Sequence, residues 1–180
     1  MKKTITSIGL DLSLVGTGVV ILENGKIIKQ SLIKSKPSGD KPVDEVKRIQ
    51  GIVSEIEYII SDYVLDIAVI EGMAFMAKNT TALVQLSALN YMTRALLMGY
   101  ETPFVIVAPT SLKKFVTGNG AAKKDVMLIE IYKRYGVSIM DDNEADAYSL
   151  SQVGLALLKG NSKPITKTQE EVLSLLRKQL

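Results

Sequence analysis

Three carboxylates stand at the ends of expected elements along this 180-residue chain. Asp11 closes an apolar run and is followed by a glycine-punctuated turn at 13–18, Glu71 closes a second apolar run, and Asp146 lies in the acidic start of an expected helix. An ionised acid at the tip of a buried strand is costly to remove from water unless a positive group accompanies it. A divalent cation is a suitable partner, so the three acids predict metal-assisted phosphoryl chemistry.

The composition removes several other kinds of site. The chain has no histidine and no cysteine, which excludes serine–histidine hydrolysis, cysteine nucleophiles, disulfides and zinc sites built from imidazoles or thiolates. Carboxylates, lysines and hydroxyls remain for catalysis. Ligation by oxygen alone favours hard ions such as Mg²⁺ or Mn²⁺.

Length and composition are those of one ordinary globular domain, with 47% hydrophobic and 23% charged residues. The first residues lead directly into a short strand pattern, and no uninterrupted apolar span is long enough for a membrane helix. We therefore expect a cytoplasmic protein that has no membrane partner.

The charges are unevenly distributed although the formal net charge is only +3. Residues 109–136 carry six lysines and arginines against two acids, whereas residues 137–150 carry four acids and no base. In an arbitrary protein such lysines would more often be solvated than bound to phosphate. A basic stretch beside an acidic pocket nevertheless suits a phosphate backbone held near a metal site.

The first third of the chain predicts three strands that follow one another as a meander. They are expected over residues 5–11, 19–22 and 26–33, with Asn24-Gly25 as the hairpin turn between the second and the third. Apolar residues then recur at three- and four-residue steps over 43–60, which predicts an amphipathic helix.

From residue 66 onward, strand and helix patterns alternate as they do in βαβ units. The expected strands are 67–70 and 104–107, and the expected helices are 80–98, a short one from Pro109, 121–135 and 143–158. A capping-box pattern at 168–171 (TQEE) predicts a terminal helix that docks on the body or on a partner. We therefore divide the chain into a domain at 1–160 and a C-terminal helical tail at 161–180.

This order of elements, with one acid on the first strand and another on the fourth, is typical of the α/β ribonuclease H-like fold. We expect a five-stranded mixed sheet with helices on both faces. In that arrangement the tips of the first and fourth strands lie side by side, so Asp11 and Glu71 become neighbours.

Four segments resemble the RuvC-type Holliday junction resolvases, and together they span about residues 5–158. They are the opening strand and turn (IGLD at 8–11 with GTG at 16–18), the second acidic strand and its loop (IEGMAFMAKN at 70–79), the basic loop and helix start (109–124), and the terminal acidic motif (NEADA at 143–147). The resemblance implies a homodimeric endodeoxyribonuclease of DNA recombination and repair, in a bacterial cell or a phage-infected host. Such an enzyme nicks opposing strands of four-way DNA junctions by two-metal hydrolysis.

The resemblance also implies a ligand set, made of four carboxylates that hold two Mg²⁺ ions per active site, for which Mn²⁺ can substitute. Asp11, Glu71 and Asp146 match three of these acids. The fourth position is Asn143, with Asp142 one residue earlier. Asn143 could ligate through its amide oxygen, or Asp142 could take its place. We favour Asn143 because it keeps the three-residue step to Asp146.

The same comparison implies how DNA is held. Phe75 falls where the family places an aromatic residue that stacks against unpaired bases, and Lys113 and Lys124 fall on basic positions near the scissile phosphate. Lys124 is therefore included among the catalytic residues, as a group that steadies the pentacoordinate phosphate. The expected DNA-binding residues are Phe75, Lys78, Lys113, Lys114, Lys123 and Lys124.

Two alternatives stay open at this point. An Asp followed by a Gly-Thr turn also opens ATP-binding domains of the actin and sugar-kinase type, but those proteins need two related domains around a cleft and this chain supplies one. The other alternative is a non-catalytic binder of DNA junctions that lost activity through the asparagine at position 143.

Overall fold

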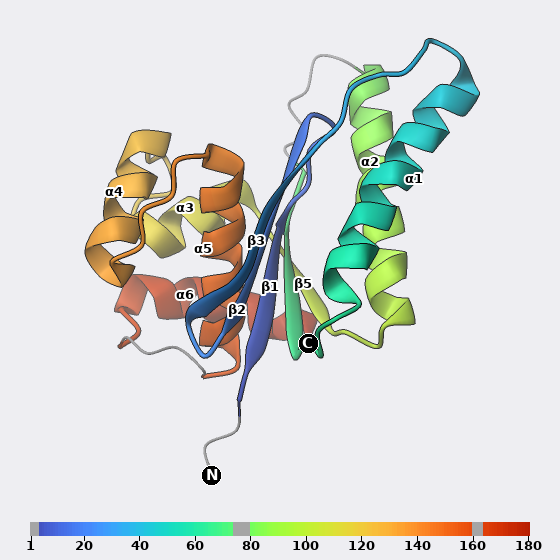
Figure 1. Cartoon of the computed structure of the whole chain (residues 1–180). Coiled ribbons are helices and arrows are strands. Elements are labelled where there is room, and N and C mark those ends of the chain that lie inside the picture. The colour runs from blue at the N-terminus through green and yellow to red at the C-terminus, as the bar shows by residue number, and fades with distance from the viewer. Residues whose placement is uncertain (1–3, 74–79, 160–163) are drawn as a thin grey trace.

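A five-stranded mixed sheet runs through the middle of the molecule in the order β3-β2-β1-β4-β5 (Figure 1). This computed structural model describes residues 4–73, 80–159 and 164–180. The strands are β1 (Thr6–Asp11), β2 (Gly16–Glu23), β3 (Lys26–Lys34), β4 (Ile67–Glu71) and β5 (Phe104–Val107). The first three strands pair antiparallel, whereas β4 is parallel to both β1 and β5.

Helices cover both faces of the sheet (Figure 1). One face carries α1 (Pro42–Ile60) and α2 (Thr80–Gly99), and the other carries α3 (Pro109–Thr117), α4 (Lys124–Tyr135), α5 (Asp142–Leu157) and α6 (Lys167–Leu176). The predicted ribonuclease H-like arrangement is therefore confirmed. In the described ranges, no helix combines the length and the apolarity that crossing a bilayer requires.

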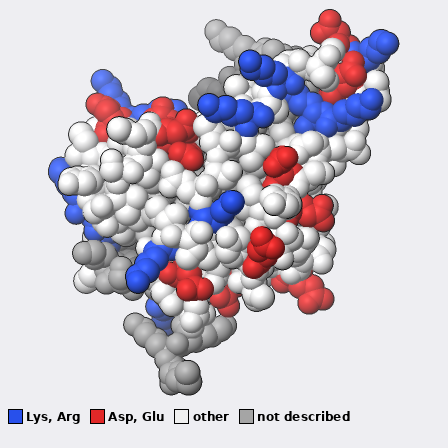
Figure 2. Space-filling model, in the orientation of Figure 1, with Lys and Arg blue, Asp and Glu red and all other residues white. Residues whose placement is uncertain are grey.

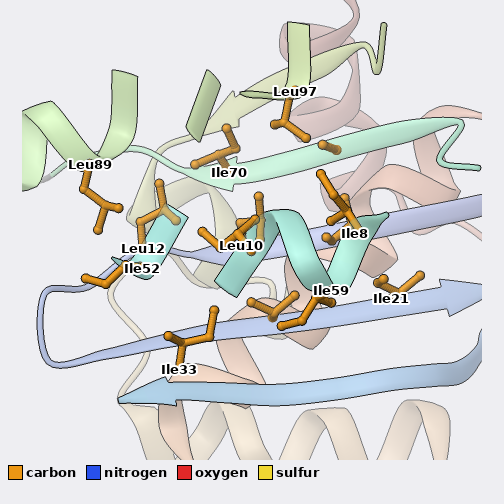
Figure 3. Close-up of a cluster of buried hydrophobic side chains, with 14 of the residues drawn as sticks. Ile8, Leu10, Leu12, Ile21, Ile33, Ile52, Ile59, Ile70, Leu89 and Leu97 are labelled. Atoms are coloured by element: carbon orange, nitrogen blue, oxygen red, sulfur yellow. The ribbon is translucent and has the colours of Figure 1, made fainter. Parts of the chain in front are cut away.

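Successive side chains of a strand point to opposite faces of the sheet, so alternate residues of β1 face the two helical layers. Ile8 and Leu10 join the buried cluster beneath α1 and α2, where Figure 3 shows them beside Ile70, Leu89 and Leu97. The intervening residues of β1, including Asp11, therefore face α5.

The hairpin between β2 and β3 turns as its sequence predicts. Asn24 and Gly25 both have positive φ, 49° and 88°. This is the backbone that a two-residue turn of this kind needs, and asparagine and glycine adopt it at the lowest cost.

Two expected helix starts were wrong. Helix α4 begins at Lys124 rather than at residue 121, because Asn119 holds the preceding residues in a turn by accepting the N–H of Ala121 on its side chain and that of Ala122 on its carbonyl. Helix α6 is capped by Thr166, whose hydroxyl accepts the N–H of Gln169 at 3.2 Å, and not by Thr168. Thr166 meets the same spacing rule, so the sequence contained the correct signal two residues earlier.

The C-terminal segment packs against the body. Val172, Leu173 and Leu176 of α6 join the buried cluster that includes Val105 of β5. After α6, a single 3₁₀ turn (Arg177–Gln179) brings Gln179 to the edge strand β5, where its side-chain amide accepts the N–H of Ile106 at 2.8 Å and donates to the carbonyl of Ile106 at 3.0 Å.

Candidate active site

Strand pairing brings Asp11 and Glu71 together. Leu10 of β1 pairs with Ile70 of β4 in a parallel ladder, so the next residue on each strand stands at the same end of the sheet. Asp11 is only 7% exposed, and Glu71 is half-buried. Sixty residues of sequence separation thus become one step across neighbouring strands.

Two glycines allow α5 to lie directly on the sheet. A Cβ on Gly9 would stand 1.9 Å from the carbonyl oxygen of Ala147, and a Cβ on Gly18 would stand 2.1 Å from that of Asn143. No side chain fits in either gap. The absence of a Cβ at both places lets the helix bring Asp146 against the strand that ends at Asp11.

The start of α5 is fixed by Asp141, a role that the sequence analysis did not assign. The carboxylate of Asp141 accepts the backbone N–H groups of Asn143 and Glu144, at 2.9 and 3.2 Å. The spacing of Asp141 to Glu144 is itself an N-terminal helix signal and could have identified the cap. The charge of Asp141 also raises the pKa of Asp11.

The three predicted acids are coupled through their charges. Burial, followed by the charge of Asp146, raises the pKa of Asp11 to about 7. Burial, followed by the charge of Asp11, raises the pKa of Glu71 to about 8. Burial also raises the pKa of Asp146 to about 6, against the opposing charge of Lys124. Each carboxylate is therefore costly to ionise here, and a cation bound among them would remove that cost.

The three acids are close to one another but are not arranged as a metal-binding site. Across the described ranges, no group of three acidic side chains is gathered tightly enough to hold a metal ion. Asp11 and Glu71 interact through charge and through a side-chain hydrogen bond, and the charge of Asp146 acts on both.

The four lysines predicted at 113–124 separate into distinct groups. Lys124 donates a hydrogen bond to Asp142 at 3.1 Å, and its charge lowers the pKa of Asp146. Lys113 lowers the pKa of both Glu71 and Asp146, which places its charge within reach of the acids. These two lysines accompany the site.

The other two lysines lie elsewhere. Lys114 makes an ion pair with Glu171 of α6 at 2.9 Å, so its charge is directed toward the C-terminal helix. Lys123 is exposed at the N-cap of α4. The predicted Phe75 and Lys78 lie outside the described residues.

The two candidates for the fourth ligand have different surroundings. Asp142 is engaged by Lys124 and raises the pKa of Asp146. Asn143 is half-buried, and its amide nitrogen lies 3.2 Å from the place where a Cβ on Gly16 would be. Gly16 is two residues from Gly18, which pairs directly with Asp11, so the Asn143 amide lies on the Asp11 face of the sheet.

Comparison with known proteins connects this geometry to one family. The family described as "Crossover junction endodeoxyribonuclease RuvC" matches residues 7–169. A protein of that name from a strain of Prochlorococcus marinus is 29% identical over 156 residues, which cover 82% of this chain and 96% of the relative. Its namesake from another strain of the same species, MIT 9303, is 27% identical over 154 residues, covering 82% and 96%.

Solved structures agree on the fold. T. thermophilus RuvC, in complex with a Holliday junction substrate, superposes with a TM-score of 0.73 at 14% identity and covers 89% of this chain and 99% of that one. The yeast mitochondrial Holliday junction resolvase Ydc2 gives 0.57 at 10% identity, covering 96% and 80%. From the family match over most of its length, this chain belongs to the RuvC crossover junction endodeoxyribonuclease family.

Proposed function

We propose that this protein is a metal-dependent endonuclease that resolves four-way DNA junctions. The observation that carries the proposal is the meeting of three acids, Asp11, Glu71 and Asp146, from two strands and a helix. Burial raises the pKa of each of them, and the charge of a neighbouring acid of the three raises the pKa of Asp11 and of Glu71 further. Family membership supplies the substrate class, since the relatives are named crossover junction endodeoxyribonucleases.

The donor set fits hard divalent cations. We assign Asp11, Glu71, Asp146 and the amide oxygen of Asn143 as ligands for two Mg²⁺ ions, with Mn²⁺ as a substitute, because carboxylate and amide oxygens are what these ions prefer. When bound by these residues, such ions would supply an activated water and positive charge to offset the charge on the leaving oxygen. A neutral fourth ligand leaves the site one negative charge short of an all-acid set.

The remaining residues act on the phosphate. Lys113 and Lys124 place positive charge beside the acids, where it would oppose the charge growing on the pentacoordinate phosphate. Asp142 accepts a hydrogen bond from the Lys124 ammonium at 3.1 Å. Lys124 would exchange this carboxylate for a phosphate oxygen when substrate arrives.

A homodimer is part of the proposal, since paired nicks on a two-fold symmetric junction are most simply made by two symmetry-related sites. Helix α2 offers a surface for it. Val84, Tyr91 and Met98 recur every seven residues and are 66%, 65% and 68% exposed. A stripe of large apolar side chains on one helix face is typical of a surface that a second helix covers. The partner we assign to it is α2 of a second copy.

The test is nicking of a synthetic four-way junction in Mg²⁺. Asp11→Asn should abolish cleavage while junction binding is retained or tightened, because the change removes one negative charge near the DNA. Asp62→Asn makes the same chemical change at an exposed loop acid and should cut like wild type.

Each other outcome is informative. A wild-type protein that binds junctions in Mg²⁺ or Mn²⁺ without nicking them would support the non-catalytic binder. Clear residual cleavage by Asp11→Asn would remove Asp11 from the centre of the ligand set. ATP binding without DNA binding would favour the kinase-like alternative.

A further inference from the structure

A second basic cluster lies outside the residues that the family resemblance implies for DNA binding. The segment that links β3 to α1, together with the start of α1, carries five bases and three acids over residues 34–48. Figure 2 shows blue side chains gathered at the upper right of the molecule, over the place where Figure 1 shows this segment. Lys34, Lys36 and Lys47 are all exposed.

These three lysines share a groove. A cavity of about 370 Å³ is lined by them and by Arg48, with the hydroxyl-bearing Ser35 and Ser38 and one acid, Glu55. Gly51 also lines the cavity, and a Cβ there would meet nothing within 4 Å. Among the described residues, none of the three lysines takes part in a salt bridge. The groove therefore presents positive charge and hydroxyl groups that the protein itself leaves largely unneutralised.

Arg48 fixes the groove to the active site. Its guanidinium donates to the hydroxyl of Ser35 at 2.9 Å and to the carbonyl of Leu14, and the Ser35 hydroxyl donates to the same carbonyl at 2.7 Å. Leu14 belongs to the turn that follows Asp11. The Arg48 guanidinium is therefore engaged in hydrogen bonds within the protein, whereas the three lysines are available to bind a ligand.

The sheet register shows how far Lys34 lies from Asp11. Gly18 pairs with Asp11 and Gly16 pairs with Lys34, so Lys34 stands two strands away from Asp11 at the same end of the sheet. Neighbouring strands are about 4.8 Å apart and successive residues of a strand about 3.4 Å, so two strand steps and an offset of two residues make this separation about 12 Å. A duplex of that length carries about seven phosphate charges. Figure 1 shows α3 and α4 on the opposite side of the sheet from the start of α1, so the groove and the lysines of those two helices lie on opposite sides of the strands that end at Asp11 and Glu71.

We propose that Lys34, Lys36 and Lys47 form a second DNA-backbone site, which holds the phosphates of a duplex arm leaving the active site. The inference rests on the proposed function for its substrate. It adds that the DNA is held on both sides of the carboxylates. Lysines on flexible stems that carry no fixed partner suit sequence-independent phosphate contact.

The experiment measures binding of a four-way junction and of a linear duplex by fluorescence anisotropy, at salt concentrations between about 50 and 200 mM. All proteins carry Asp11→Asn so that no DNA is cut. One variant changes Lys34, Lys36 and Lys47 to alanine, and a second changes them to arginine. A matched control changes the exposed Lys26, Lys167 and Lys178 to alanine, which removes the same charge elsewhere.

Each phosphate contact contributes about 0.9 to the slope of log affinity against log salt. The alanine variant should therefore show a slope smaller by about two to three on both DNAs. The arginine variant and the matched control should keep the parent slope, and all proteins should melt alike.

Three results would overturn the inference. An unchanged slope in the alanine variant, with a parent that binds junctions, would refute the second site and leave the proposed function standing. An equal loss in the matched control would show a general charge effect. A parent that binds neither DNA would remove both proposals.

Discussion

Burial of Asp11 should make the protein less stable as the pH rises toward neutrality. The pKa of Asp11 is about 7 in the folded state, against 3.8 for the ordinary side chain. Between those two values the folded protein holds a proton that the unfolded chain has released. Stability therefore falls with rising pH through this window, which is opposite to the usual behaviour of a salt-bridged acid.

The size of the effect follows from the shift. One pH unit inside the window changes the free energy of unfolding by about 1.4 kcal/mol per group, so Asp11 alone accounts for about 2 kcal/mol between roughly pH 5.5 and pH 7. For a chain of this length that is about 4–8 °C in Tm. Burial also raises the pKa of Glu71 to about 8 and that of Asp146 to about 6, so both groups add to the effect in the same direction, and the chain has no histidine that titrates beside them.

Asp11→Asn should weaken this dependence in two ways. The amide has no proton to lose, and it no longer contributes the charge that raises the pKa of Glu71. We expect the variant to melt above wild type at pH 8 and close to it at pH 5.5. Addition of Mg²⁺ should stabilise wild type at pH 8 more than the variant, because the cation relieves the repulsion that the variant already lacks.

The assay is thermal unfolding followed by circular dichroism in EDTA and in Mg²⁺, with Asp62→Asn as the exposed-acid control. Asp62→Asn should follow the wild-type pH curve. The reasoning fails if wild type keeps or gains stability from pH 5.5 to 8 in EDTA, or if Asp11→Asn melts below wild type at pH 8.

Three further outcomes are expected. Asn143→Asp should lower the Mg²⁺ concentration needed for half-maximal cleavage, since it adds a charged ligand; an unchanged titration beside an inactive Asp142→Ala would assign the fourth oxygen to Asp142. Gly9→Ala should lower the free energy of unfolding, measured in urea, by about 3 kcal/mol or more, because the added Cβ meets a backbone carbonyl of α5 at 1.9 Å. Gly51→Ala has open space around the added Cβ and should raise the free energy of unfolding slightly. Tyr91→Asp should convert a dimer into a monomer in sedimentation at micromolar concentration without altering the fold, and a wild-type monomer that cuts junctions fully would contradict the assignment of α2 to the interface.

Local pattern was enough to predict most of the elements and the three acids. The Asn24-Gly25 turn and the apolar spacing of α1 are encoded within a few residues, because turn chemistry and helical periodicity act over short distances. The acids were recognisable for a related reason. A carboxylate that closes an apolar run implies a cost of burial that something must offset.

The partners of charged side chains could not be predicted in this way. Lys114 and Lys124 lie in similar basic pairs in the sequence, yet the first is bound by Glu171 of α6 and the second by Asp142 of α5. Neither acid is near its lysine in the chain. Helix packing decides which of these two lysines lies beside the acids of the candidate active site, and that packing depends on contacts across the whole fold.

The meaning of the glycines was likewise settled only by tertiary structure. The sequence predicts a turn at Gly16 and Gly18, but the structure places both in β2; Gly9 reads in the sequence as one small residue inside a strand. In the fold, Gly9 and Gly18 are the places where α5 touches the sheet too closely for any side chain. The sequence by itself determined that Asp11, Glu71 and Asp146 stand near the ends of strands and the start of a helix. The close packing of α5 on Gly9 and Gly18 determined that they meet. Only the tertiary structure could decide this, because the lack of a Cβ matters only where another part of the backbone occupies the space that the Cβ would fill.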